Sequence, residues 1–265
     1  MLFSDRPRQH YARSALREVI CQLRFPAILS IGANEPAAFQ EAIRHVFPRY
    51  ARKVDNPPPK PAVVNGTTQL IQQPAVVNYH FLSADSRWKL NLTSEFISLS
   101  TLAYGGWESF GGMLDLPLAQ FIRLYQPAFF QRIGLRYVNL FSRRDLGLEG
   151  TPWRDLFTAP YLGILAEEDV EEARAVQAGV SFDLRLDSSC RAKVHAGPGL
   201  VKSTQPGAAQ DNEVKFVLDM DLSMGGELAP MLAAGALETL HGHAAPLFEG
   251  AVTDALREAM ENMEN

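Results

Sequence analysis

The sequence predicts an α+β fold in which one β-α-β-β-β-α unit is used twice in 265 residues. A strand-like segment at 20–25 (ICQLRF) has a counterpart at 132–137 (RIGLRY), each with an arginine between a leucine and an aromatic residue. A helical stretch, three strand-like segments and a second helix follow each copy. Such duplication predicts the fold from spacing alone. We expect halves 1–130 and 131–265 to form one compact unit.

In the first half, alternation of apolar and polar residues over 18–25 has the period of two that is typical of a strand. Asn34 is the predicted N-cap of a helix over 35–50. The proline-rich stretch 56–61 indicates an extended loop. The remaining elements are expected as strands over 76–81, 88–92 and 96–102 and a helix over 107–125.

In the second half, a strand over 133–141 is followed by a short helix after Thr151 and Pro152. Its three further strands are expected over 178–186, 191–195 and 214–222. A helical region over 227–260 ends the chain, with a predicted kink at Pro246.

Consecutive strands are linked by short turns, which favours an antiparallel sheet over a parallel, doubly wound one. The order of elements resembles the TATA-binding-protein and helix-grip folds. That resemblance implies one curved antiparallel sheet with its helices on one face, and it implies nothing about function.

Four segments are similar to a sporadically distributed family of uncharacterised bacterial conserved hypothetical proteins. They are 16–19 (LREV) leading into 23–25 (LRF), 104–110 (YGGWESF), 132–139 (RIGLRYVN), and 248–249 (FE) followed by 253–257 (TDALR). Ala15 departs from the proline usual in that family. Because the family has no assigned activity, the resemblance implies no catalytic residues.

Composition places the chain among globular proteins, with 46% hydrophobic and 21% charged residues. No apolar run approaches the roughly 20 residues that span a bilayer, and the N-terminal residues lack a secretory signal, so a cytoplasmic location without membrane contact is expected. The two cysteines, Cys21 and Cys190, favour reduced packing thiols. A net charge of −5 argues against nucleic acid as a partner.

If the apolar half of each strand faces the helices, the other half forms an open face. The residues on that face that we expect to bind a ligand or partner are Glu18, Arg24, Arg136, Arg185 and Lys193. Arg24 and Arg136 would meet about the axis relating the halves and could hold a carboxylate or phosphate. The alternative is that each arginine pairs with a nearby acid such as Glu18.

The same face also suggests a divalent-metal site built from Asp183, His195, Asp219 and Asp221. Asp219 and Asp221 would lie about 7 Å apart on one strand, an arrangement also common on solvent-facing strands. No cysteine or histidine spacing supports zinc. His241 and His243 do not share a helical face, so we expect His241 to be buried and hydrogen-bonded instead.

No nucleophile elbow, phosphate loop, H-E-x-x-H or G-x-G-x-x-G motif occurs in the sequence. We therefore predict a non-catalytic binding or accessory protein without a cofactor. Its mixed-charge sheet face would meet a partner protein or a polar, anionic ligand, and apolar residues on that face would also suit a homodimer. The alternative is a metal-dependent hydrolase acting on phosphate esters through the four residues named for the metal site.

Overall fold

The computed structural model describes residues 2–64, 66–201 and 211–261. The strands are β1 Leu16–Arg24, β2 Arg49–Asp55, β3 Lys60–Val64, β4 Thr67–Ile71, β5 Val76–Leu82, β6 Trp88–Leu92, β7 Phe96–Thr101, β8 Phe130–Phe141, β9 Val180–Arg185, β10 Cys190–Leu200 and β11 Val214–Leu228. The α-helices are α1 Leu29–Ala33, α2 Ala37–Ile43, α3 Trp107–Tyr125, α4 Arg143–Leu146, α5 Trp153–Leu156, α6 Ala233–Ala251 and α7 Asp254–Glu261. Short 3-10 helices are η1 Ala159–Tyr161, η2 Gly163–Ala166, η3 Glu172–Arg174 and η4 Pro230–Leu232.

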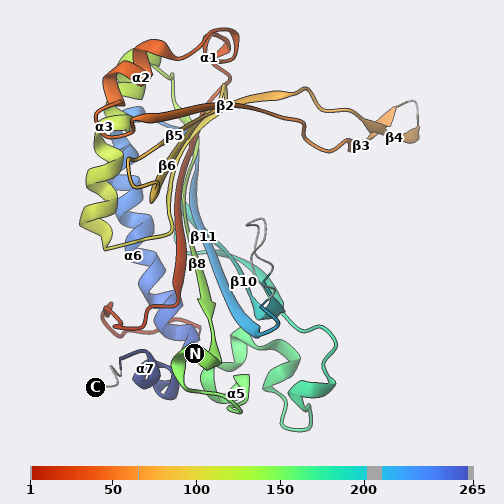
Figure 1. The fold of residues 1–265 in the computed structure, drawn as a ribbon. Coiled ribbons are helices and arrows are strands. Elements are labelled where there is room, and N and C mark those ends of the chain that lie inside the picture. The colour runs from red at the N-terminus through yellow and green to blue at the C-terminus, as the bar shows by residue number, and fades with distance from the viewer. Residues whose placement is uncertain (1, 65, 202–210, 262–265) are drawn as a thin grey trace. The chain divides into compact units, whose positions relative to one another are not determined.

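The strands form a large curved antiparallel sheet in the order β2-β5-β6-β7-β1-β8-β11-β10-β9, and β3 and β4 form a separate two-stranded sheet (Figure 1). The predicted α+β class and antiparallel sheet are therefore confirmed. Among the helices of the described ranges, none combines the length and the apolar character that crossing a membrane requires.

The chain divides into two compact units. Unit 1 contains the described residues within Met1–Val19, Gly134–Met224 and Ala234–Asn265, and unit 2 those within Ile20–Ile133 and Gly225–Ala233. The first residues group with the later part of the chain because their backbone is hydrogen-bonded there. The N–H of Leu140 donates to the carbonyl of Ala15 at 2.7 Å, for example.

In unit 2, the expected strands over 76–81, 88–92 and 96–102 are present as β5, β6 and β7, with antiparallel register. The helix predicted over 107–125 is α3, which continues through Pro117 and buries Phe110, Leu114, Leu118 and Phe121. Aromatic rings connect α3 to the end of β1, since the ring centroids of Phe121 and Phe25, the residue after β1, are 4.7 Å apart. Burial of such rings is a large source of stability.

The predicted helix over 35–50 is too long. Helix α2 ends at Ile43, and residues 49–55 form β2 instead, paired with β5. Pro48 explains the change, because a proline disfavours helical backbone in the residue before it.

The stretch expected as a proline-rich loop leads into a hairpin arm, which we define as β3 and β4 (Figure 1). Its described side chains are mostly exposed, including Val63 at 73% and Leu70 at 72%. The arm therefore adds little to the core of unit 2.

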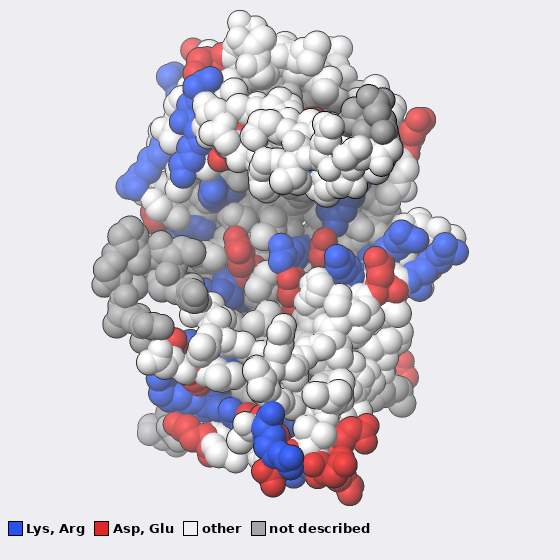
Figure 2. Space-filling view, turned by 90° about the vertical axis from the view of Figure 1, so that its right-hand side faces the viewer, with Lys and Arg blue, Asp and Glu red and all other residues white. Residues whose placement is uncertain are grey.

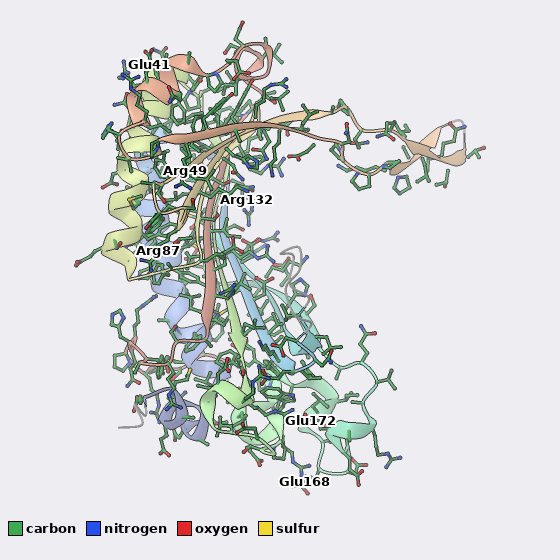
Figure 3. All side chains as sticks on the ribbon, in the orientation of Figure 1. Glu41, Arg49, Arg87, Arg132, Glu168 and Glu172 are labelled. Atoms are coloured by element: carbon green, nitrogen blue, oxygen red, sulfur yellow. The ribbon has the colours of Figure 1, made fainter. Side chains whose placement is uncertain are left out.

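In unit 1, β8 to β11 pack against α6 and the segment from α4 to η3. Phe157 and Phe216 stack with centroids 3.7 Å apart, and Phe141 lies 6.2 Å from Phe248 of α6. Glu172, labelled in Figure 3, accepts from the N–H of Trp153 at 3.0 Å and pairs with Arg143 at 2.9 Å. These bonds join α4, α5 and η3 within the otherwise irregular segment, and the Phe157–Phe216 stack holds the segment against the strands.

The C-terminal helical region differs from its prediction. Strand β11 runs to Leu228, and helix α6 continues through Pro246 without ending there. The break lies at 252–253, where the N–H of Thr253 donates to the carbonyl of Leu156 at 3.0 Å. Bonding to α5 therefore replaces helical bonding at this point, and α7 begins at Asp254.

Candidate functional site

Unit 1 presents polar side chains on one face of β9, β10 and β11. On β10, Ala192 and Val194 are fully buried, whereas Arg191, Lys193 and His195 between and beside them are exposed. This alternation is the one expected from the sequence. We call this surface the charged face, and its residues are Arg136, Ser181, Asp183, Arg185, Arg191, Lys193, His195, Asp219, Asp221 and Ser223.

The register arranges the charged face in three rows across the strands, and directly opposed side chains in a sheet are close enough to interact. The rows are Ser181–His195–Asp219, Asp183–Lys193–Asp221 and Arg185–Arg191–Ser223. The charges of the middle row alternate in sign, so its neighbouring side chains attract one another. The last row sets two arginines directly opposite each other, which is unfavourable. In Figure 2, basic and acidic side chains lie intermingled.

Arg136 and Asp219 form a bidentate ion pair. Nε of Arg136 donates to Oδ1 at 2.7 Å and its Nη2 to Oδ2 at 2.5 Å. Hydrogen bonding to Asp219 is also the main cause of the raised pKa of Arg136. The alternative in which Arg136 pairs with an acid is thus the one observed, although the acid is Asp219 and not Glu18.

Arg24 belongs to unit 2, where its guanidinium lies 3.5 Å from the carboxylate of Glu95. Both side chains are largely exposed, so this ion pair is weak. The meeting of Arg24 with Arg136 at one anion stays a prediction, as does the binding role of Glu18 on β1.

Three of the four predicted metal ligands lie beside or opposite cations of the same face. Arg136 occupies both carboxylate oxygens of Asp219, and Lys193 lies opposite both Asp183 and Asp221. Within the described part of the chain, the metal-ligating atoms that gather within 4.8 Å of one another belong to a different group. The four-residue metal site stays a prediction.

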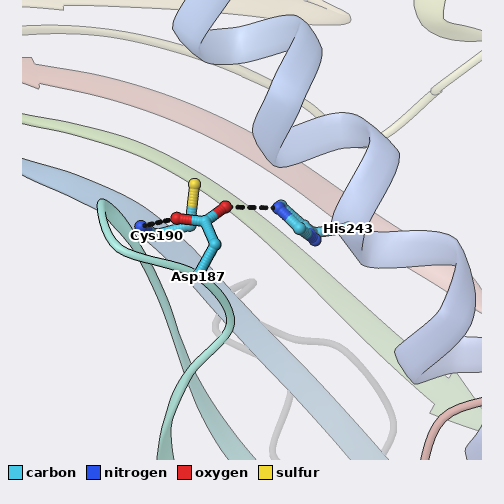
Figure 4. Close-up of side chains that lie close together, drawn as sticks. All are labelled: Asp187, Cys190 and His243. Atoms are coloured by element: carbon cyan, nitrogen blue, oxygen red, sulfur yellow. Dashed lines mark hydrogen bonds and ion pairs between the residues drawn. The ribbon is translucent and has the colours of Figure 1, made fainter.

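That group consists of Asp187, Cys190 and His243. Asp187 lies in the turn between β9 and β10, and its Oδ1 accepts from the N–H groups of Ser189 and Cys190, both at 2.7 Å. Its Oδ2 lies 2.9 Å from Nε2 of His243 on α6 (Figure 4). The group therefore joins the end of a hairpin to a helix.

Electrostatics assign the protonation states of two of these residues. Backbone N–H donors lower the pKa of Asp187, so it is a carboxylate at neutral pH. Burial, followed by the neighbouring Asp187, raises the pKa of the Cys190 thiol to about 11. A thiol that keeps its proton is a poor nucleophile.

From the sequence, Cys190 is predicted to be a packing thiol, and no metal-binding role is predicted for Asp187 or His243. A recognisable signal was present, since Asp187 and Cys190 flank a two-residue turn between strands. His241 has the expected hydrogen bond, with its Nδ1 2.6 Å from the Tyr137 hydroxyl. Burial, and then Arg8, lower the pKa of His241 to about 4.

The last of the family-like segments forms an ionic cluster with a buried centre and an exposed edge at Asp254. Arg257 donates from Nε to Glu249 at 3.0 Å and from Nη1 to Asp254 at 2.6 Å, and the Tyr11 hydroxyl donates to Glu249. Glu249 and Arg257 are almost fully buried. The charged residues of this segment thus serve one another as partners, beside a shallow, open groove of about 750 Å³ lined also by residues 3–7.

Neither protein-family models nor curated proteins match this sequence. The similarity to the bacterial family stays a prediction.

Proposed function

We propose that this chain is a non-catalytic binding protein whose charged face accepts an acidic group of a partner protein at Arg185 and Arg191. One observation carries the proposal: these two exposed arginines are paired in register across β9 and β10. Within the described residues, neither has an ion pair with an acid. Elsewhere on the face, Lys193 lies opposite two carboxylates and Arg136 binds a third.

Two like charges directly opposite on a sheet cost up to about 1 kcal/mol. A carboxylate between the two guanidinium groups would remove that repulsion and accept charge-assisted hydrogen bonds from the N–H groups of both arginines. Local violations of favourable patterning are expected at functional sites. The Arg185–Arg191 pair is therefore the best-supported point of contact.

The pattern of charges supports a protein partner. A nucleic acid presents negative charge uniformly, whereas Asp183 and Asp221 would repel such a surface on either side of Lys193. A protein segment can present charges of both signs in matching positions, and such complementarity provides specificity.

Fluorescence anisotropy of a labelled hexaglutamate peptide tests this proposal, with salt at about 0.05 M and about 0.15 M. We expect Arg185→Gln with Arg191→Gln to weaken binding by about tenfold or more, in line with the loss of two charge-assisted bonds. The matched control is Arg154→Gln with Arg174→Gln, which removes the same charge from exposed positions of unit 1. Equal weakening in both double variants, or none in the first, would overturn the proposal.

We further propose that the two halves of the chain arose by duplication, with a fold like that of the TATA-binding protein. The strand order supports this, since it runs β1-β7-β6-β5 outward in one direction and β8-β11-β10-β9 in the other. In both repeated segments the leucine and ring are buried while Arg24 and Arg136 are exposed.

In the homodimer that the sequence also suggests, a second copy of the chain would cover the charged face. Light scattering of the purified protein measures the molar mass and so tests for this dimer. The competing hydrolase predicts a thermal shift on adding Mg²⁺ or Mn²⁺ that Asp183→Asn with Asp221→Asn abolishes. Unchanged melting of the unmodified chain in both ions would count against it.

A further inference from the structure

We infer that Asp187, Cys190 and His243 form a zinc-binding site, independently of the charged face. Each residue offers one ligand atom, and the three atoms lie within 4.8 Å of one another (Figure 4). Zinc bonds of about 2.0–2.3 Å in a tetrahedron place ligand atoms about 3.3–3.8 Å apart. Small side-chain movements bring the three atoms to that separation.

The donor set selects the ion. A carboxylate oxygen, a thiolate sulfur and an imidazole nitrogen are the three ligand types that zinc accepts in proteins. Mg²⁺ and Ca²⁺ require oxygen ligands, so a site containing Cys190 disfavours both. On binding, the thiol gives its proton to solvent as the zinc–sulfur bond forms.

The turn between β9 and β10 prepares two of the ligands. Asp187 and Cys190 are separated by two residues, the spacing with which paired ligands commonly enter zinc sites from a turn. The N–H groups of Ser189 and Cys190 hold Oδ1 of Asp187, which leaves Oδ2 directed toward His243. Ligands oriented by such secondary hydrogen bonds bind metal more tightly.

The third ligand, His243, comes from helix α6, whereas the other two come from the end of the β9–β10 hairpin. A bound ion would therefore connect the end of the β9–β10 hairpin to the helix. The side chains of Asp187 and His243 are 37% and 32% exposed, so water reaches the cluster and supplies the fourth ligand. Three protein ligands with one open position are a recognised zinc arrangement.

The test is zinc uptake by the full chain, measured by competition with a chromogenic chelator, together with the Co²⁺ spectrum that reports thiolate ligation. We expect one ion per chain and a sulfur-to-cobalt charge-transfer band in the near ultraviolet. Cys190→Ala and His243→Gln should each weaken zinc binding by about 100-fold or more. Cys21→Ala and His241→Gln are matched controls, because Cys21 is equally buried and His241 lies on the same helix.

Replacing the fully buried Cys190 can destabilise the fold, so Asp187→Asn serves as a second variant. Its amide oxygen still accepts the turn N–H groups but is a weaker zinc ligand, and the affinity should again fall. The inference is overturned if the unmodified chain takes up no zinc or shows no thiolate band. It is equally overturned if the control variants lose as much affinity as the ligand variants.

Discussion

Asp219 binds Arg136 through both carboxylate oxygens, yet the two partners differ sharply in exposure. The side chain of Asp219 is 12% exposed and that of Arg136 45%. Arg136→Ala therefore leaves a mostly buried carboxylate without its main donor, and we expect a loss of about 1–3 kcal/mol in the free energy of unfolding. Urea denaturation measures this loss.

The matched control is Arg24→Ala, which removes an arginine from an exposed pair at 3.5 Å. That variant should change stability by no more than about 0.5 kcal/mol. Equal losses for the two arginines would show that the bidentate contact contributes nothing beyond an ordinary surface ion pair.

His241 should make the free energy of unfolding depend on pH between 6.5 and about 4, because folding lowers its pKa from 6.5 to about 4. The stabilising contribution of neutral His241 is fully present at pH values above its pKa in the unfolded chain, 6.5. It is lost as the pH falls toward the folded pKa of about 4, since the unfolded chain binds the proton first. The slope is at most about 1.4 kcal/mol per pH unit, reduced by partial exposure.

Urea unfolding of the unmodified chain and of His241→Gln, near neutral pH and near pH 4, separates this effect from that of other groups. His80 also has a lowered pKa, so the unmodified chain alone is not sufficient. The stability advantage of the unmodified chain over the variant should shrink on acidification. A difference that stays constant would contradict the assignment.

Two glycines of α6 should respond to alanine in opposite directions. A Cβ at Gly250 would lie 2.3 Å from the carbonyl oxygen of Leu2, so Gly250→Ala must displace backbone and should cost about 1–3 kcal/mol. A Cβ at Gly242 meets no atom within 4 Å, and Gly242→Ala should stabilise the helix by about 0.5–1 kcal/mol. Thermal or urea unfolding compares them. Similar effects at both positions would refute the packing of the N-terminal segment on α6.

The hairpin arm should be removable. Asp55 of β2 and Val76 of β5 are directly paired, so replacing residues 56–75 by Asn-Gly closes a two-residue hairpin. Because the described side chains of the arm are mostly exposed, the free energy of unfolding should change by less than about 0.5 kcal/mol. A loss above about 2 kcal/mol would reveal stabilising contacts between the arm and the sheet.

Much of the local structure was predictable from residue periodicity. The strands β5, β6 and β7 and the long helix α3 match their predicted ranges closely. Alternation also predicted which side chains of β9, β10 and β11 face the solvent, because side-chain direction in a strand follows from neighbouring residues alone.

Other boundaries depended on contacts that periodicity does not contain. Helix α2 ends before Pro48 and is followed by β2, which is stabilised by pairing with β5. Helix α6 passes through Pro246 and ends where Thr253 bonds to the carbonyl of Leu156. At α2 the local effect of Pro48 ends the helix and pairing with β5 forms the strand, whereas at Thr253 a bond to a distant segment outweighed the helical preference.

Residue patterns were enough to predict the α+β class, most strands and helices, and the polarity of each strand face. The polar residues that come together are visible only in the folded chain: Arg136 with Asp219, Arg185 with Arg191, and Asp187 with Cys190 and His243. Strand register and helix docking, which bring these residues together, are set by the packing of the whole chain. Because side chains alternate with a period of two, a shift of two residues in register keeps every side chain on its face but changes the residues that lie opposite it, and local propensity does not specify that choice.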